Sequence, residues 1–214
     1  MRYVDREDAG RALAGPIAAA LGEAGVTSKP LVLGIPRGGV AVAAPLANQL
    51  GAELNVVLAR KVGAPGNPEL ALGAVGERGE TVLIEDVISG LGVGAEVLQT
   101  AIEEAQRELE RRLAVYRRAR PAPEIAGRVV VVVDDGVATG ATFRATLETV
   151  RHLDPSLLVG AVPVGPVETT SALARIADIF VCPQRPRRFR AVSEWYDRFD
   201  QVSEEQVVEL LRSG

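Results

Sequence analysis

The chain has 214 residues, of which 47% are hydrophobic and 24% charged, and its formal net charge at pH 7 is −4. These values predict one soluble globular domain without a general attraction to nucleic acid; no apolar run is long enough to cross a membrane, and the opening MRYVDREDAG is unlike a signal peptide. The single Cys182 and single His152 exclude an internal disulfide and a His/Cys zinc site, and one thiol suits a reducing cytoplasm.

The first quarter of the chain alternates helical and extended patterns. A helix is predicted over residues 8–24, because Leu13, Ile17 and Leu21 recur on one face. A buried strand, a helix and a second strand follow, over residues 31–35, 40–50 and 54–59. This order is typical of a sheet with helical crossovers.

The next segments differ in character. Residues 61–68, KVGAPGNP, contain too much glycine and proline for regular structure, and they are predicted to form a flexible stretch that closes over the site as a lid. Residues 71–75 and 81–84 are predicted to form a hairpin. A long helix over residues 94–118 then places its apolar residues on one face, so its many charged residues are interpreted as a solvated face.

The second half returns to alternating elements. A strand of five valines, Val129 to Val133, is followed by a helix over residues 143–152. A strand, a helix, a strand and a last helix are predicted over residues 157–162, 167–176, 178–182 and 203–212.

Together these patterns predict an α/β fold: a doubly wound, mainly parallel sheet with helices on both faces, a long-helix insertion and a small C-terminal hood. The single domain, residues 1–214, would divide into a core of about 1–84 and 125–183, a helical insertion of about 85–124 and a hood of about 184–214.

The most informative motif lies where the valine strand ends. Asp134 and Asp135 follow Val133 directly, and a loop of small residues leads into the next helix. A strand, a loop rich in backbone N–H groups and a helix N-terminus form an anion cradle. Two acids beside such a cradle suit a phosphorylated sugar with vicinal hydroxyls and Mg²⁺, whereas an ordinary strand–loop–helix would not normally end in two like charges.

This run resembles the signature of the type I phosphoribosyltransferases: apolar residues, two acids and a loop carrying T-G-x-T. The resemblance implies that Asp134 and Asp135 hold the ribose hydroxyls of 5-phosphoribosyl-1-diphosphate and contact Mg²⁺, with Asp135 also stabilising positive charge near the ring. It implies that the donor's 5′-phosphate is bound by Gly136, Val137, Ala138, Thr139, Gly140, Ala141 and Thr142. Gly136 departs from the family pattern, which usually has an aliphatic residue there.

A second loop follows the first strand. Arg37, Gly38 and Gly39 combine a fixed positive charge with a backbone that can approach a ligand closely, although alone they are as consistent with a plain turn. In the family the matching loop binds the diphosphate leaving group, which gives Arg37 a catalytic role. Lys61, after the second strand, would add charge to the diphosphate; a surface cation is the alternative.

The predicted hood contains Trp195 and Tyr196, the only adjacent aromatic pair. Family members place an aromatic face here against the acceptor base, which makes these two residues candidate base-binding residues; the alternative is that Trp195 anchors the tail to the core. Four arginines could line the mouth of the site, although a solvated basic turn is the preferred interpretation: Arg185, Arg187, Arg188 and Arg190.

A competing motif, G-x-G-x-x-A over residues 90–95, would suggest a dinucleotide. The helix that follows it has no second strand behind it, so the segment is interpreted as a helix start.

The resemblance predicts a cytoplasmic, Mg²⁺-dependent phosphoribosyltransferase of nucleotide or nucleoside metabolism that transfers phosphoribosyl from 5-phosphoribosyl-1-diphosphate to a nitrogenous base. Its partners would be small molecules rather than nucleic acid or membrane, and a homodimer stays open. Ala138 stands where 6-oxopurine enzymes carry an aspartate, which argues against that acceptor class. Two alternatives remain: a non-catalytic sensor of the same donor, and a different phosphosugar enzyme such as a hydrolase.

Overall fold

The core of the molecule is a five-stranded parallel sheet. The computed structural model describes residues 2–213, without the side chains of Pro68 and Glu69. The strands run in the order β2-β1-β6-β7-β8, and every neighbouring pair is parallel. Their bounds are β1 Leu31–Gly34, β2 Glu53–Val56, β6 Val129–Val133, β7 Leu157–Ala161 and β8 Ile179–Val181.

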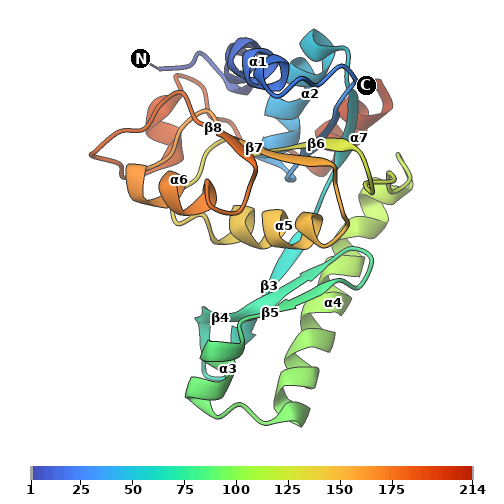
Figure 1. Cartoon of the computed structure of the whole chain (residues 1–214), viewed down its shortest axis with the longest axis vertical. Helices are drawn as coiled ribbons and strands as arrows, with labels where there is room; N and C mark the ends of the chain where they lie inside the picture. Colours follow the sequence, from blue (N-terminus) through green and yellow to red (C-terminus); the bar gives the residue numbers. More distant parts are fainter. Residues whose placement is uncertain (1, 214) are drawn as a thin grey trace.

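Helices cover both faces of this sheet, as Figure 1 shows: α1 and α2 lie on one face and α5 and α6 on the other. This arrangement confirms the predicted α/β fold. The helices of the core are α1 Arg6–Glu23, α2 Gly38–Leu50, α5 Ala141–Arg151, α6 Val167–Leu173 and α7 Glu204–Ser213, with a short 3₁₀ helix η1 at Val192–Trp195.

The valine strand β6 is buried on both faces because successive side chains of a strand point to opposite sides. Val131 belongs to the apolar cluster that includes residues of α1 and α2, whereas Val130 and Val132 belong to the cluster that contains Phe143 of α5. All five valines are at most 7% exposed. The two helical layers therefore fix β6, and with it the point at which the acidic residues begin.

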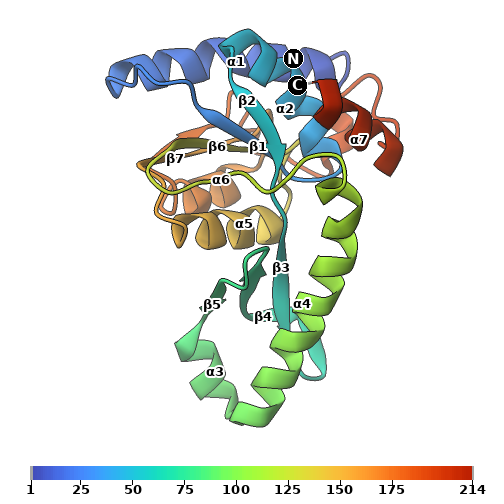
Figure 2. The ribbon, with the colours of Figure 1, turned by 90° about the vertical axis from the view of Figure 1, so that its right-hand side faces the viewer.

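The remaining elements form an arm that projects from the core (Figures 1 and 2). Its antiparallel sheet runs in the order β3-β4-β5 and packs against a long helix. The arm contains β3 Ala59–Ala64, β4 Asn67–Gly76, β5 Thr81–Leu83, α3 Glu85–Leu91 and α4 Ala95–Arg117. The hairpin of β4 and β5 and the long helix confirm two predictions, whereas α3 was not predicted.

The prediction that residues 61–68 lack regular structure is wrong. These residues include most of β3 and the start of β4, joined by a turn at Pro65 and Gly66, where Gly66 has φ +74. Proline followed by a glycine with positive φ is typical of a type II turn, so the composition indicated a tight hairpin. The second core strand is also shorter than predicted: β2 ends at Val56 and β3 begins at Ala59.

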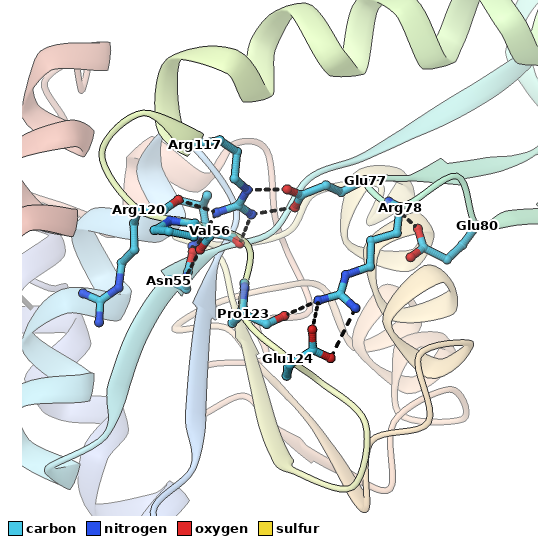
Figure 3. Close-up of polar contacts among 10 residues, drawn as sticks. Asn55, Val56, Glu77, Arg78, Glu80, Arg117, Arg120, Pro123 and Glu124 are labelled. Carbon is cyan, nitrogen blue, oxygen red and sulfur yellow. Dashed lines mark hydrogen bonds and ion pairs between the residues drawn. The ribbon is translucent and has the colours of Figure 1, made fainter.

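Arg117, the last residue of α4, joins the arm to the core (Figure 3). Its guanidinium donates to both carboxylate oxygens of Glu77, which follows β4. It also donates to Asn55 Oδ1 at 2.8 Å and to the carbonyl of Val56 at 3.0 Å, both on β2. A single partly buried cation thus connects the end of α4, the β4–β5 turn and a core strand.

A second ion pair lies beside it in Figure 3, where Arg78 donates to the Pro123 carbonyl at 2.7 Å and to Glu124 at 3.2 Å.

The residue boundaries predicted for core, insertion and hood stay a prediction. The β3–β5 sheet, which those boundaries place in the core, lies in the arm. Within residues 2–213, no helix is both long and apolar enough to cross a membrane.

Candidate active site

Two loops meet at the carboxyl edge of the sheet. Strands β1 and β6 are neighbours, with Gly34 paired to Val133, and the Ile35 amide donates to the Val133 carbonyl at 2.9 Å. The segment 36–39, here called the RGG loop, and the segment 134–142 therefore leave the sheet side by side. Ligands of open α/β sheets bind at such an edge.

The glycines of the RGG loop are required by close packing against the acidic residues. A Cβ on Gly38 would lie 1.9 Å from Asp135 Oδ2, and one on Gly39 would lie 2.6 Å from the Val133 carbonyl oxygen. Neither distance leaves room for a side chain. The Pro36–Arg37 peptide bond in this loop is cis. A plain turn would not require both glycines to lie so close to the end of β6 and the acidic pair.

Asp134 and Asp135, here called the acidic pair, are partly buried. Burial raises the pKa of Asp134 well above its usual range, and the negative charge of Asp135 raises that pKa further. Burial also raises the pKa of Asp135, whereas the Arg6 guanidinium acts to lower it. Asp134 Oδ1 accepts a hydrogen bond from the Asp135 amide at 2.9 Å. Within residues 2–213, the other oxygen of each carboxylate accepts no hydrogen bond, so each can still contact a ligand.

Arg6, the first residue of α1, is a functional candidate that the sequence patterns missed. Its Nε donates to Asp135 Oδ2 at 2.7 Å, and the two side chains are only 12% and 16% exposed. Its guanidinium carbon lies 3.8 Å from the centre of the Phe199 ring, and its Nη1 donates to the Asp200 carbonyl at 2.7 Å. No local pattern could have found it, because 129 residues separate Arg6 from Asp135.

The segment 136–142, here called the phosphate loop, packs against neighbouring elements at some residues and is exposed to solvent at others. Gly136 has φ +152, and a Cβ there would lie 2.6 Å from Val192 Cγ1, which explains the departure from an aliphatic residue. Thr169 of α6 donates to the Ala138 carbonyl at 2.9 Å. Four residues of the loop are exposed: Ala138, Thr139, Ala141 and Thr142.

The amides of this loop divide into two groups. The Val137 amide donates to the Val164 carbonyl at 3.0 Å and its side chain is 3% exposed, so Val137 packs in the core and its amide is not available to a phosphate. Within residues 2–213, the amides of Ala138, Thr139 and Gly140 donate no hydrogen bond. Unpaired amides that precede a helix are the groups that bind an anion.

The predicted diphosphate residues come from two parts of the molecule. Arg37 precedes α2 in the RGG loop, and within residues 2–213 its side chain makes no hydrogen bond or ion pair. Lys61 lies on β3 of the arm. It lines a groove of about 760 Å³ that also reaches Thr142 of the phosphate loop. The arm thus borders the predicted 5′-phosphate site.

The predicted base-binding pair needs a correction. Tyr196 is 2% exposed, packs against Tyr3 and Phe199 with ring centres 5.6 and 4.9 Å away, and donates its hydroxyl to the Asp135 carbonyl at 2.5 Å. Its ring therefore has no open face for a base in this structure, and its visible role is to hold the backbone of Asp135. Trp195 is partly buried beside this cluster, and its Nε1 is buried without a hydrogen-bond partner within residues 2–213.

Other candidate residues have ordinary structural roles. The competing glycine motif falls at the tip of the arm, where Gly92 ends α3 and Gly94 precedes α4, as expected for a helix start. Arg185 donates to side chains of α6, at 2.8 Å to Thr170 and 2.8 Å to Ser171. Burial raises the pKa of the Cys182 thiol to about 11.

Comparison with known proteins identifies the family. Residues 6–178 match the family model described as "Phosphoribosyl transferase domain". The chain belongs to this phosphoribosyl transferase family. Its resemblance to the type I phosphoribosyltransferases, first seen in the T-G-x-T loop and the acidic pair, is thereby confirmed.

Two relatives show how far this similarity extends. The chain is 43% identical over 209 residues to "Putative phosphoribosyl transferase Rv0571c" of Mycobacterium tuberculosis, and the match covers 98% of this chain and 46% of that protein. The chain thus spans about half the length of this relative. A crystal structure of TT1426 from Thermus thermophilus is 45% identical and superposes with a TM-score of 0.90, covering 100% of this chain and 99% of that one.

Proposed function

We propose that the chain transfers a 5-phosphoribosyl group from 5-phosphoribosyl-1-diphosphate to a nitrogenous base and releases diphosphate. The observation that carries this proposal is the acidic pair at the end of β6, followed in the phosphate loop by three amides that donate no hydrogen bond within residues 2–213. Membership of the phosphoribosyl transferase family supports the reaction class. Cytoplasmic nucleotide or nucleoside metabolism with small-molecule partners is part of the proposal.

The acidic pair also fits Mg²⁺. Hard divalent cations prefer oxygen ligands, and Mg²⁺ is commonly held by one or two carboxylates together with substrate phosphates. Within residues 2–213, Asp134 and Asp135 each keep an oxygen without a hydrogen-bond partner, and no group of three His, Cys, Asp or Glu residues could hold a metal by itself. When bound, Mg²⁺ would neutralise charge on the diphosphate.

The residues of this chain would act by positioning and by charge. Amides 138–140 and the hydroxyls of Thr139 and Thr142 would hold the 5′-phosphate, while the acidic pair orients the ribose. Asp135 would stabilise positive charge that develops near the anomeric carbon, and Arg37 would stabilise negative charge on the departing diphosphate. Such fixed charges contribute to catalysis because they require no rearrangement during the reaction. The partly buried Trp195 is the remaining candidate for stacking on the base.

One assay separates transfer from its alternatives. The protein is incubated with the donor, Mg²⁺ and a panel of nitrogenous bases, and released diphosphate is measured. Release that depends on one base supports transfer, and release without any base indicates hydrolysis instead. Saturable donor binding with neither result would replace transfer by a sensor function.

The sensor alternative has one observation in its favour. Arg6 already occupies Asp135 Oδ2 at 2.7 Å, so one oxygen of the predicted catalytic carboxylate is engaged within the protein. A sensor needs only to bind the donor, and the carboxylate oxygens that Arg6 does not contact can still do so. Base-dependent release of diphosphate would exclude this alternative.

A further inference from the structure

A groove lies between β3 and α4. Figure 2 shows α4 running alongside the β3 strand, and the groove of about 760 Å³ between them has a volume typical of ligand sites. Thr142 of the phosphate loop forms one part of its lining, and Val97 and Ala101 of α4 form another. The groove therefore meets the phosphate loop of the predicted donor site at Thr142.

The charged side chains of the groove are mainly positive. Arg60, Lys61 and Arg112 line it, against one acidic residue, Glu104. Arg60 has a distant carboxylate partner, Glu108 at 3.9 Å. Arg112 makes no hydrogen bond and no ion pair within residues 2–213. A cation that lines a groove without a protein partner is available to an anionic ligand.

Arg112 and Arg37 both act electrostatically on one buried residue of α4, Tyr116. Tyr116, one turn further along α4, is 1% exposed. Burial and the charge of Glu204 raise the pKa of Tyr116, while the positive charges of Arg112 and Arg37 both act against that rise. Arg112 and Arg37 thus act on the same hydroxyl, although one comes from the arm and the other from the core.

We propose that Arg112 is a further anion-binding residue of the donor site, and that the groove between β3 and α4 holds the diphosphate group. This inference rests on the proposed function and assigns to α4 a role that its charge pattern concealed, since that pattern was interpreted as a solvated face. The diphosphate carries several negative charges, and a guanidinium can donate two parallel hydrogen bonds to it. The core therefore binds the sugar phosphate, and the arm completes the site for the leaving group.

The test compares two arginines of the same helix. Arg107 of α4 is exposed and does not line the groove, so Arg107→Gln is the matched control for Arg112→Gln. Calorimetry measures the binding of diphosphate with Mg²⁺, of ribose 5-phosphate and of the complete donor. Arg112→Gln is expected to weaken diphosphate and donor roughly tenfold or more, because a charge-assisted contact is lost. Ribose 5-phosphate binding is expected to stay unchanged, and Arg107→Gln is expected to match the wild type in all three.

Each other outcome has a defined meaning. Equal diphosphate affinity in the two variants, or no diphosphate binding by the wild type, overturns the inference. A loss of ribose 5-phosphate affinity as large as the loss for diphosphate would also overturn it, since the groove would then bind the sugar phosphate. Diphosphate binding that depends on Arg112, without any donor binding, would retain the anion site and reject the proposed function. Arg112 is exposed, so the variant is expected to fold, and Arg112→Lys should restore part of the affinity.

Discussion

Two partly buried arginine–carboxylate pairs in this molecule have similar exposure but different surroundings. In the arm joint, Arg117 and Glu77 are 16% and 18% exposed; at the edge of the sheet, Arg6 and Asp135 are 12% and 16% exposed. Arg117 donates to Glu77, to Asn55 and to backbone carbonyls, and both oxygens of Glu77 are bonded. This network satisfies its own polar groups (Figure 3).

The Arg6–Asp135 pair is incomplete by comparison. Within residues 2–213, one oxygen of Asp135 accepts no hydrogen bond, and Asp135 lies next to Asp134, whose pKa is raised by burial and by the charge of Asp135. Burial and pairing alone therefore do not identify a functional site, since the arm joint has both. Unused acceptor atoms beside a like charge are the feature that indicates a ligand.

The largest effect on stability is expected in the arm joint. Arg117→Met leaves Glu77 buried without its partner, and breaking such a pair should lower the free energy of unfolding by about 3 kcal/mol. Chemical denaturation measures this value. Arg111→Met, which removes an exposed ion pair of the same helix, is the control and should leave the transition unchanged. A loss no larger than that of the control would show that the joint contributes little.

Substitutions in the acidic pair should affect donor binding more than stability. Replacing Asp134 and Asp135 by Asn should reduce donor affinity by more than about 100-fold, because charged contacts to the ribose hydroxyls and Mg²⁺ disappear. Thermal stability of Asp134→Asn alone should be unchanged or higher, because a negative charge beside Asp135 is removed while the Arg6–Asp135 ion pair stays. Calorimetry and thermal unfolding measure the two quantities, and normal donor binding by this double variant would contradict the ribose assignment.

Arg6 is expected to have an intermediate effect. Arg6→Gln should lower the free energy of unfolding by about 1–2 kcal/mol, less than Arg117→Met, because Arg6 donates to fewer acceptors than Arg117 does. Arg11→Gln, whose pair with Glu7 is exposed, is the control from the same helix. If denaturation showed Arg6→Gln to be as costly as Arg117→Met, the contrast between the two pairs would be lost.

The smallest effect concerns pH. A carboxyl group whose folded-state pKa is raised favours folding while it is protonated, and this contribution is lost as pH rises through the folded-state pKa. The raised pKa of Asp134 therefore predicts that Asp134→Asn, which keeps the Arg6–Asp135 pair, exceeds the wild type in stability at pH 7. The difference should shrink as pH falls toward the usual value of 3.8. A difference that grows on acidification would contradict this sign.

Local patterns were sufficient to predict the centre of the site. The valine run, the acidic pair and the small-residue loop lie within one segment, and β6 and α5 are where the sequence placed them. The RGG loop was found for the same reason, because its signal is contained in adjacent residues.

Features that depend on distant contacts were not predictable. Arg6 meets Asp135 only in the folded chain, and Tyr196 is buried because Tyr3 and Phe199 enclose it. The strand β3 was missed because Val62 and Ala64 are buried by other elements, while the local composition suggested an irregular loop. The orientation of Arg112 into the groove likewise depends on where α4 packs.

The most direct test of the central claim is a crystal structure of the protein with 5-phosphoribosyl-1-diphosphate and Mg²⁺. We predict that the ribose hydroxyls lie within hydrogen-bonding distance of Asp134 and Asp135, and that the 5′-phosphate is bound by the amides of residues 138–140. A donor bound away from both the acidic pair and the phosphate loop, or no bound donor at saturating concentration, would contradict the account.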